Sequence, residues 1–157
     1  MLALFRALLT FGIVSGVAGV VVALGLLHPF SSSVKDEDLL RAQQLGIVKP
    51  LDLDPLSGWV IVHPGEARPL IVFIHGRSGN RMQMFPVAKE FFQFGYNVAL
   101  WDLRHHGNSS GAETYGKHEI GDVLRIVETV RIDPAVDPER ISLLGFSLGA
   151  GMSIGAG

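Results

Sequence analysis

The chain begins with a long apolar segment and continues with shorter apolar runs that polar residues separate. Residues 7–27 contain no charged side chain over 21 positions. As an α-helix this segment would extend about 31 Å, close to the thickness of the hydrocarbon core of a bilayer. The pattern predicts that residues 1–30 form a membrane anchor with a single transmembrane helix at residues 7–27, a retained signal-anchor.

A cleaved signal peptide is the alternative interpretation of this segment. The apolar region of a signal peptide usually runs about 7–15 residues and ends in small residues at the cleavage site. The run here is longer, and His28 and Pro29 follow it, so a retained anchor is favoured. Arg6 precedes the run, whereas Lys35 and Arg41 follow it. This distribution gives a slight bias toward an N-terminus inside the cytoplasm and a remaining chain outside it.

Residues 31–56 are expected to connect the anchor to a folded domain. Three serines at residues 31–33 make a polar start, and leucines recur at helical spacing within residues 36–45. Gly46 stands where a helix commonly ends. The pattern therefore predicts one short helix in a juxtamembrane connector, and a domain that begins at residue 57 and continues to residue 157.

From Trp59 onward, apolar runs alternate with segments of helical period. Continuous apolar runs are typical of strands that are buried on both faces. Four such runs are the predicted strands, at residues 59–63, 70–74, 97–101 and 141–145. Two segments with helical period lie between them, at residues 82–94 and 119–130. The order strand, helix, strand, helix, strand requires a parallel sheet with helices on its faces, so the predicted fold class is α/β.

The composition excludes several classes of function. The net charge is −2 and no basic block occurs, so binding to nucleic acid is not expected. The absence of cysteine excludes a disulfide framework, a thiol nucleophile and a zinc site with sulfur ligands. None of the six histidines has the spacing of a zinc protease. Neither a metal nor a cofactor is therefore expected.

The pattern G-x-S-x-G occurs three times, centred on Ser109, Ser147 and Ser153. In hydrolases that use it, the serine lies on a sharp turn between a buried strand and a helix. The glycines on either side avoid a collision between a Cβ atom and the neighbouring backbone. Only Ser147 follows a predicted strand and precedes a segment that can begin a helix. Ser147 is therefore the candidate nucleophile, with Gly145 and Gly149 as the glycines of the turn, whereas Ser109 and Ser153 are expected in a loop and inside a helix.

Residues 57–157 resemble the α/β-hydrolase superfamily in three blocks that stand in the order of that family. Residues 73–80 (FIHGRSGN) resemble the His-Gly segment beside the oxyanion hole, residues 101–109 resemble the D-x-R-G-x-G-x-S loop, and residues 145–149 resemble the nucleophile elbow. The chain is most similar to membrane-anchored bacterial members of the serine-aminopeptidase-like and esterase-like hydrolases. The resemblance implies the N-terminal part of an α/β-hydrolase fold, a mostly parallel sheet flanked by helices. In that fold the strand at residues 70–74 would lie between those at 97–101 and 141–145, with 59–63 at one side.

The resemblance also implies roles for the matched residues. Ser147 would attack an acyl carbonyl and form a covalent intermediate. The backbone N–H groups of Arg77 and Leu148 would bind the oxyanion that forms. The substrate would be an ester, a thioester or an amide, carried by a small molecule, a lipid or a peptide, and a location in a bacterial cell membrane would follow.

Four further residues of these blocks are expected to support the site rather than to react. His75 and Gly76 would shape the end of a strand, so His75 is not expected to be the catalytic base. Asp102 and Arg104 would form a pair that shapes a loop. His105 stands where the family usually has glycine, and we expect an ordinary negative φ there; the alternative is that it places an imidazole near the mouth of the site.

The order of the catalytic groups in the superfamily is serine, then Asp or Glu, then histidine. Both partners of Ser147 are therefore expected after residue 157, and the chain is expected to be an N-terminal fragment. Without a base the serine hydroxyl is a poor nucleophile, so the fragment alone is expected to be inactive. The alternative is a non-catalytic binding module or a degenerate remnant of the same fold.

Overall fold

The computed structural model describes residues 10, 12–22 and 31–157. The chain divides into two compact units, Met1–Phe30 and Ser31–Gly157. In the first unit, residues 12–22 are helical and exposed. Among the described residues, no helix is both long enough and apolar enough to cross a membrane. The predicted anchor at residues 7–27 lies partly outside the described residues, so its full length stays a prediction.

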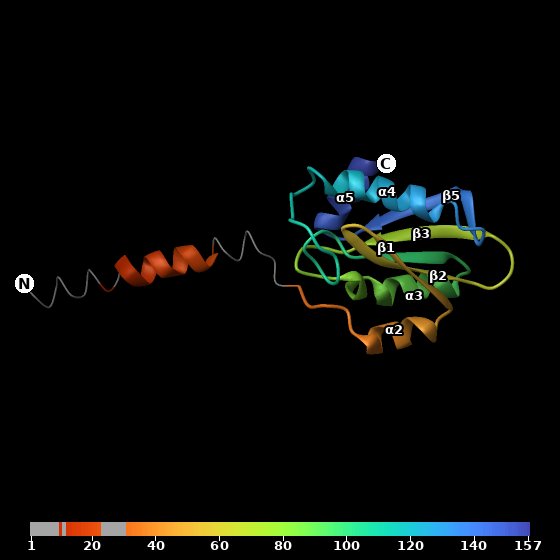
Figure 1. Ribbon diagram of the computed structural model, residues 1–157, viewed down its shortest axis with the longest axis horizontal. Helices are drawn as coiled ribbons and strands as arrows, with labels where there is room; N and C mark the ends of the chain where they lie inside the picture. Colours follow the sequence, from red (N-terminus) through yellow and green to blue (C-terminus); the bar gives the residue numbers. More distant parts are fainter. Residues whose placement is uncertain (1–9, 11, 23–30) are drawn as a thin grey trace, which may run out of the picture. The chain divides into compact units, whose positions relative to one another are not determined.

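The second unit is a sheet with helices on both faces (Figure 1). Its elements, in chain order, are α2 (Asp36–Gln43), β1 (Ile47–Leu53), β2 (Leu56–Val62), β3 (Arg68–Ile74), η1 (Arg81–Gln83), α3 (Phe85–Gln93), β4 (Asn97–Trp101), α4 (Glu119–Val130), β5 (Val136–Gly145) and α5 (Leu148–Ala156). The four predicted strands are all present. The α/β class is therefore confirmed for this unit.

The strand order in the sheet is β1-β2-β4-β3-β5. Strand β3 runs parallel to both of its neighbours, β4 and β5, as expected for a central strand. Strand β2 is antiparallel to β4, and β1 is antiparallel to β2. The sheet is therefore mixed, and its parallel part is formed by β4, β3 and β5, the strands that precede or begin the three sequence blocks described above.

Strand β1 lies within residues 31–56, which were expected to be a connector. It pairs with β2 along its whole length, from Ile47 opposite Val62 to Leu53 opposite Leu56. This strand contains polar residues and a proline and so lacks a continuous apolar run, because an edge strand is only partly buried and tolerates a proline. The folded unit therefore begins before residue 57, at the helix and edge strand of this segment.

Two further boundaries differ from the prediction. The helix expected at residues 82–94 is divided into η1 and α3, and a proline stands in the first turn of α3. Proline lacks an N–H and fits the start of a helix better than its interior, so α3 begins there. Strand β5 begins at Val136 rather than at residue 141, and a register shift between Arg68 and Leu70 of β3 accommodates the additional residues.

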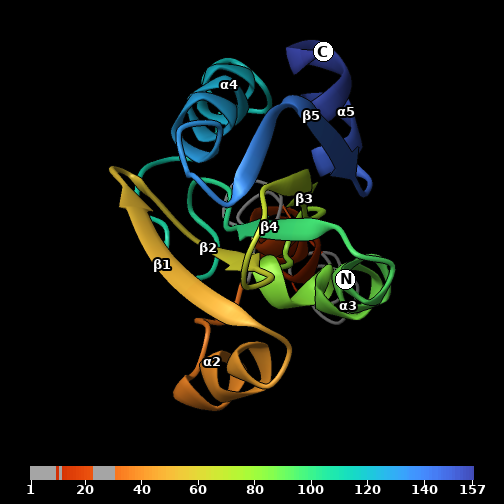
Figure 2. The same ribbon diagram turned by 90° about the vertical axis from the view of Figure 1, so that its right-hand side faces the viewer.

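Helices lie on both sides of the sheet (Figure 2), and each side has its own apolar core. Helices α4 and α5 cover one face, where Val123, Ile126 and Met152 pack against the sheet. Helices α2 and α3 cover the other face through Ala42, Ala88 and Phe92. Burial on both faces explains the continuous apolar sequence of β3 and β4, whose central residues are almost completely buried. Because both faces of β3 and β4 are covered, residues that bind or react with a ligand are expected at the ends of these strands.

Candidate active site

The three sequence blocks meet at one edge of the sheet. Ile74, the last residue of β3, is level with Trp101 at the end of β4 and with Gly145 at the end of β5. The residues that follow these three strand ends therefore start at the same height. In parallel α/β sheets this carboxyl edge is where ligands bind.

Ser147 lies on the turn between β5 and α5. Its backbone has φ 50° and ψ −114°, a conformation that residues other than glycine rarely adopt. The Phe146 amide donates a hydrogen bond to the Ile74 carbonyl at 3.0 Å, which ties the turn to β3. Ser147 itself is exposed. The strained strand-to-helix turn expected at this serine is present.

Gly145 and Gly149 are both required by close packing at this turn. A Cβ atom on Gly145 would collide with the backbone of Gly149 and Ala150. A Cβ atom on Gly149 would collide with the carbonyl groups of Ile74 and His75 at the end of β3. The two glycines therefore let α5 start directly against the strand ends.

The other two serines of the motif have different environments. The Ser109 hydroxyl donates to the Asp102 carbonyl at 2.8 Å and accepts from the Ser57 amide at 2.9 Å. The Ser153 hydroxyl donates to the Gly149 carbonyl at 2.8 Å within α5. Both hydroxyls are engaged with backbone groups, as expected for packing residues.

The segment after β3 lies directly against the serine turn. A Cβ atom on Gly76 would lie 2.9 Å from Phe146 Cδ1 and 3.3 Å from Ser147 Cβ. Arg77 follows Gly76, and Leu148 follows Ser147 as the first residue of α5. The first N–H groups of a helix have no acceptor within the helix and are available to bind an anion. Both predicted oxyanion donors therefore lie one position from the contact between the two segments.

The side chain of Arg77 contacts the loop that precedes α4. Its Nε lies 3.3 Å from both carboxylate oxygens of Glu113, which is itself almost fully buried. The guanidinium carbon lies 5.5 Å from the centre of the Tyr115 ring. These contacts join the segment after β3 to the loop that precedes α4.

His75 is buried at the end of β3 and uses both ring nitrogens. Its Nδ1–H donates to the Gly76 carbonyl at 2.7 Å, and its Nε2 accepts from the Leu103 amide at 2.9 Å. Burial lowers the pKa of His75 to about 4, although the hydrogen bond to Gly76 opposes this shift. The imidazole is therefore neutral near pH 7, and its contacts are those of a supporting residue.

Two other histidines are also engaged through the ring. His106 donates from Nδ1 to the Arg104 carbonyl at 2.7 Å and accepts at Nε2 from the Ser78 amide at 3.2 Å. His63 lies 3.0 Å from the Phe92 carbonyl through Nε2 and stacks on the Phe92 ring. Both ring nitrogens of His106 are thereby engaged, whereas the contact of His63 uses Nε2.

The pairing expected between Asp102 and Arg104 is wrong. Asp102 is completely buried and pairs with Arg81, whose Nη2 lies 2.7 Å from Oδ2 and whose amide donates to Oδ1 at 2.6 Å. Arg104 instead pairs with Asp122 of α4, at 2.5 Å and 2.9 Å. Asp102 and Arg104 are two positions apart on a turning loop, and their partners lie in different elements, so proximity in sequence did not identify them.

Arg81 is a residue that the sequence analysis missed. A carboxylate buried at a strand end requires a cationic partner, and this requirement was the available signal. The guanidinium also donates to the Ser57 hydroxyl at 2.9 Å and lies over the Trp59 ring, 4.8 Å from its centre. Arg81 therefore joins the segment after β3, the loop after β4 and strand β2.

The expectation of a negative φ at His105 is also wrong, because this residue has φ 62°. The His106 amide donates to the Leu103 carbonyl at 3.1 Å, which closes a four-residue turn with His105 at its third position. A turn with positive φ at that position favours glycine. His105 thus adopts a conformation that glycine adopts more readily.

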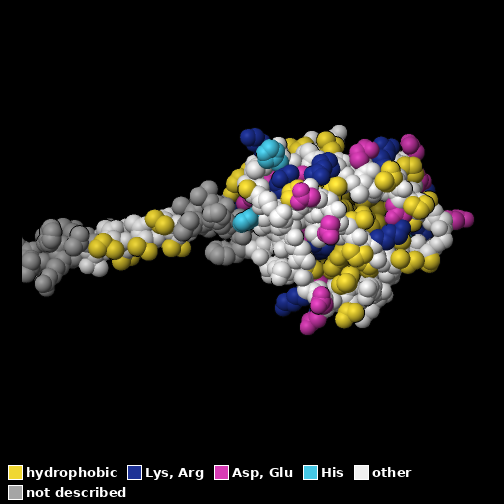
Figure 3. Space-filling model, viewed as in Figure 1, with side chains coloured by type: hydrophobic (Ala, Val, Ile, Leu, Met, Phe, Trp, Pro, Cys, Tyr) yellow, Lys and Arg dark blue, Asp and Glu magenta, His cyan; other side chains and the backbone are white. Residues whose placement is uncertain are grey.

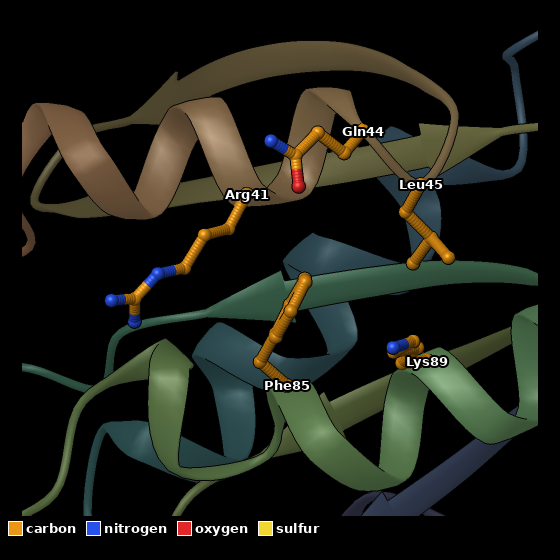
Figure 4. Close-up of a pocket in the computed structure, with 5 residues that line it drawn as sticks. All are labelled: Arg41, Gln44, Leu45, Phe85 and Lys89. Carbon is orange, nitrogen blue, oxygen red and sulfur yellow. The ribbon is translucent and has the colours of Figure 1, made fainter.

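Two cavities lie on the α2 and α3 side of the sheet. One, of about 360 Å³, adjoins the serine turn and is lined by Gln83, Met84, Val87, Leu144, Gly145 and Phe146. The second, of about 380 Å³, lies between α2 and α3 (Figure 4) and is lined by Arg41, Gln44, Leu45, Phe85 and Lys89. Only the first contains residues of the turn, so it is the cavity that belongs to the candidate site.

The charged side chains of residues 31–157 form neither a surface patch of one sign in the view of Figure 3 nor a metal site. On the face of residues 31–157 shown in Figure 3, basic and acidic side chains are interspersed, in keeping with the net charge of −2. Within the described ranges, no cluster of three histidine, aspartate or glutamate side chains is arranged to hold a metal ion.

Similar proteins include hydrolases. A thiohydrolase, aneE, of Aspergillus aculeatus is 37% identical over 114 residues, which are 69% of this chain and 36% of that protein. An uncharacterized protein of Mycobacterium tuberculosis is 30% identical over 128 residues, 81% of this chain and 43% of the other. The solved structure of the esterase Pf2001 of Pyrococcus furiosus has a TM-score of 0.68 and 28% identity, and the match covers 82% of this chain and 51% of that one.

The chain thus spans about half or less of the length of these relatives. The family model for serine aminopeptidase, S33, matches residues 65–157, which is more than half of the chain. All three segments around Ser147 lie within this range. The chain therefore belongs to the serine aminopeptidase S33 family of the α/β-hydrolase superfamily.

Proposed function

We propose that this chain carries the nucleophile and the oxyanion-binding backbone of a serine hydrolase. The observation that carries the proposal is the strained turn at Ser147, in contact with Gly76. Strained backbone of this kind persists only where the surrounding structure imposes it, and it is concentrated at active sites. Here Gly145 and Gly149 allow the close packing that imposes it.

In the proposed reaction, Ser147 Oγ attacks the carbonyl carbon of the substrate while its proton passes to a base. The carbonyl oxygen becomes an oxyanion, which the Arg77 and Leu148 N–H groups bind. Collapse of this intermediate breaks the bond to the alcohol, thiol or amine, which leaves with a proton. The acyl group remains on Ser147 until water releases it as a carboxylic acid.

The proton acceptor is proposed to come from sequence beyond residue 157. Within residues 31–157, His63, His75 and His106 contact backbone groups through their rings, as described above. The superfamily order places the acid and the histidine after the nucleophile, in the half of the relatives that this chain does not span. On this proposal the 157-residue chain is inactive by itself.

An acyl group with an apolar chain is the proposed substrate. The cavity beside the turn is lined by the apolar side chains of Met84, Val87, Leu144 and Phe146. Two of the similar proteins are a thiohydrolase and an esterase, which favours a thioester or an ester over an amide. The membrane location stays a proposal from sequence, which rests on the uncharged residues 7–27.

A fluorophosphonate probe tests the proposal, because it reacts with activated serine nucleophiles. In the chain extended through its downstream reading frame, labelling and ester hydrolysis should be abolished by Ser147→Ala. Ser153→Ala serves as the matched control in the same motif and should leave both intact. Labelling that survives Ser147→Ala would identify another nucleophile, and an extended chain that is neither labelled nor hydrolytic would favour a non-catalytic binding module.

A further inference from the structure

The peptide between Gly76 and Arg77 is held on several sides. Its carbonyl oxygen, on Gly76, accepts from His75 Nδ1–H at 2.7 Å and from the Gly79 amide at 3.1 Å. A peptide group is planar, and in the trans form its N–H points opposite to its C=O. Fixing the Gly76 carbonyl therefore also fixes the direction of the Arg77 N–H.

The preceding peptide is held by a side chain from η1. The Gly76 amide donates to Gln83 Oε1 at 2.8 Å. Because the donor is an N–H, the acceptor on the carboxamide must be its oxygen, which settles the orientation of the Gln83 side chain. Gln83 and His75 thus hold the two peptides that flank the α-carbon of Gly76.

The loop is shaped to receive this side chain. A Cβ atom on Gly79 would lie 2.6 Å from Gln83 Oε1 and 2.9 Å from Cδ, so only glycine permits the approach without displacing Gln83. The backbone of η1 is itself anchored, since Asn80 accepts from the Met82 amide and Arg81 pairs with Asp102. The backbone of η1 is therefore fixed in the position from which the Gln83 side chain contacts Gly76.

We propose that Gln83 is a positioning residue for the oxyanion-binding backbone. This inference rests on the proposed function, because it assigns a role to the Arg77 N–H. Gln83 is exposed and lines the cavity beside the turn, so its hydrogen bond lies at the site rather than in a core. A preorganised donor stabilises the transition state only when its direction is already set, and small misplacements lower the rate strongly.

The first measurement is hydrogen exchange in the 157-residue chain. Gln83→Met removes the acceptor while keeping a side chain of similar length, and should accelerate exchange of the Gly76 amide about five- to tenfold, the loss of about one hydrogen bond. Gln83→Glu keeps an acceptor oxygen and should restore the protection. Gln93→Met, at an exposed glutamine that ends α3, is the matched control and should leave the Gly76 amide unchanged.

The second measurement is steady-state kinetics in the extended chain. Gln83→Met should lower kcat about ten- to a hundredfold, below the loss expected for removing a donor altogether, while KM stays within about twofold. Gln93→Met should change neither constant. An unchanged kcat in Gln83→Met, with Ser147→Ala inactive, overturns the inference and leaves the proposed function intact. Full activity of Ser147→Ala would instead overturn the proposed function.

Discussion

Arg81 and Asp102 form an ion pair that is closed to solvent. Arg81 Nη2 lies 2.7 Å from Asp102 Oδ2, and the side chains are 1% and 0% exposed. The Asn108 amide donates to the same carboxylate oxygen at 2.9 Å. The pair therefore holds the segment after β3 and the loop after β4 together.

Removing the cation of this pair should destabilise the fold strongly. Arg81→Met leaves the Asp102 carboxylate buried without its counter-charge, and the free energy of unfolding should fall by about 3–5 kcal/mol. Arg131→Met is the control, because Arg131 pairs with Glu128 on the surface, where both side chains are exposed. That change should cost less than about 1 kcal/mol. Urea denaturation measures both, and equal losses would contradict the interpretation.

The glycines of the turn should not tolerate a methyl group. Gly149→Ala places its Cβ on the carbonyl groups of Ile74 and His75, and we expect a loss of at least about 3 kcal/mol or failure to fold. Gly151→Ala, two residues further along α5, meets no atom within 4 Å. Alanine has a higher helix propensity than glycine, so the free energy of unfolding of this control variant should rise by about 0.5–1 kcal/mol. Thermal unfolding of the two variants should therefore shift in opposite directions.

The strained backbone at Ser147 should lower the free energy of unfolding of the native chain. Glycine adopts a positive φ without the penalty that a Cβ imposes, so Ser147→Gly should raise the free energy of unfolding by about 1 kcal/mol or more. Ser153→Gly, in the interior of α5, should lower it by a similar amount. Chemical denaturation of the 157-residue chain measures both changes without any assay of activity. A destabilised Ser147→Gly variant would show that the turn is not strained.

The buried neutral imidazole of His75 should make stability depend on pH. Its pKa is about 4 in the folded chain, because burial disfavours the charged form, against 6.5 for an ordinary histidine. Between these values the unfolded chain binds more protons than the folded chain. The free energy of unfolding should therefore fall as the pH falls from about 6.5 to about 4, by roughly 3 kcal/mol in full.

Urea unfolding at several values between pH 7 and pH 4 checks this dependence. His75→Gln removes the titrating group, so its stability should vary less with pH over the same range. Other groups that titrate in this range contribute to both proteins, and the difference between the two curves isolates His75. Parallel curves would contradict the assigned shift.

The sequence was sufficient to predict the elements that apolar pattern and turn chemistry encode locally. The runs of β3 and β4 are buried on both faces, so they are continuously apolar and easily identified. Ser147 was singled out because its G-x-S-x-G pattern follows such a run, and the strained backbone is present there. Strand β1 escaped prediction, since an edge strand with Lys49, Pro50 and Asp52 lacks this signal.

The partners of the polar residues were decided only by the tertiary structure. Asp102 pairs with Arg81 and Arg104 with Asp122, because strand order brings the segment after β3 beside the loop after β4, and the side chains of this loop reach partners in different elements. Gln83 contacts Gly76 across a turn of the segment after β3, where the Gly79 amide donates to the Gly76 carbonyl. Apolar burial is a property of each residue and leaves a periodic trace in sequence, whereas a hydrogen bond or an ion pair depends on two residues whose distance the fold alone sets.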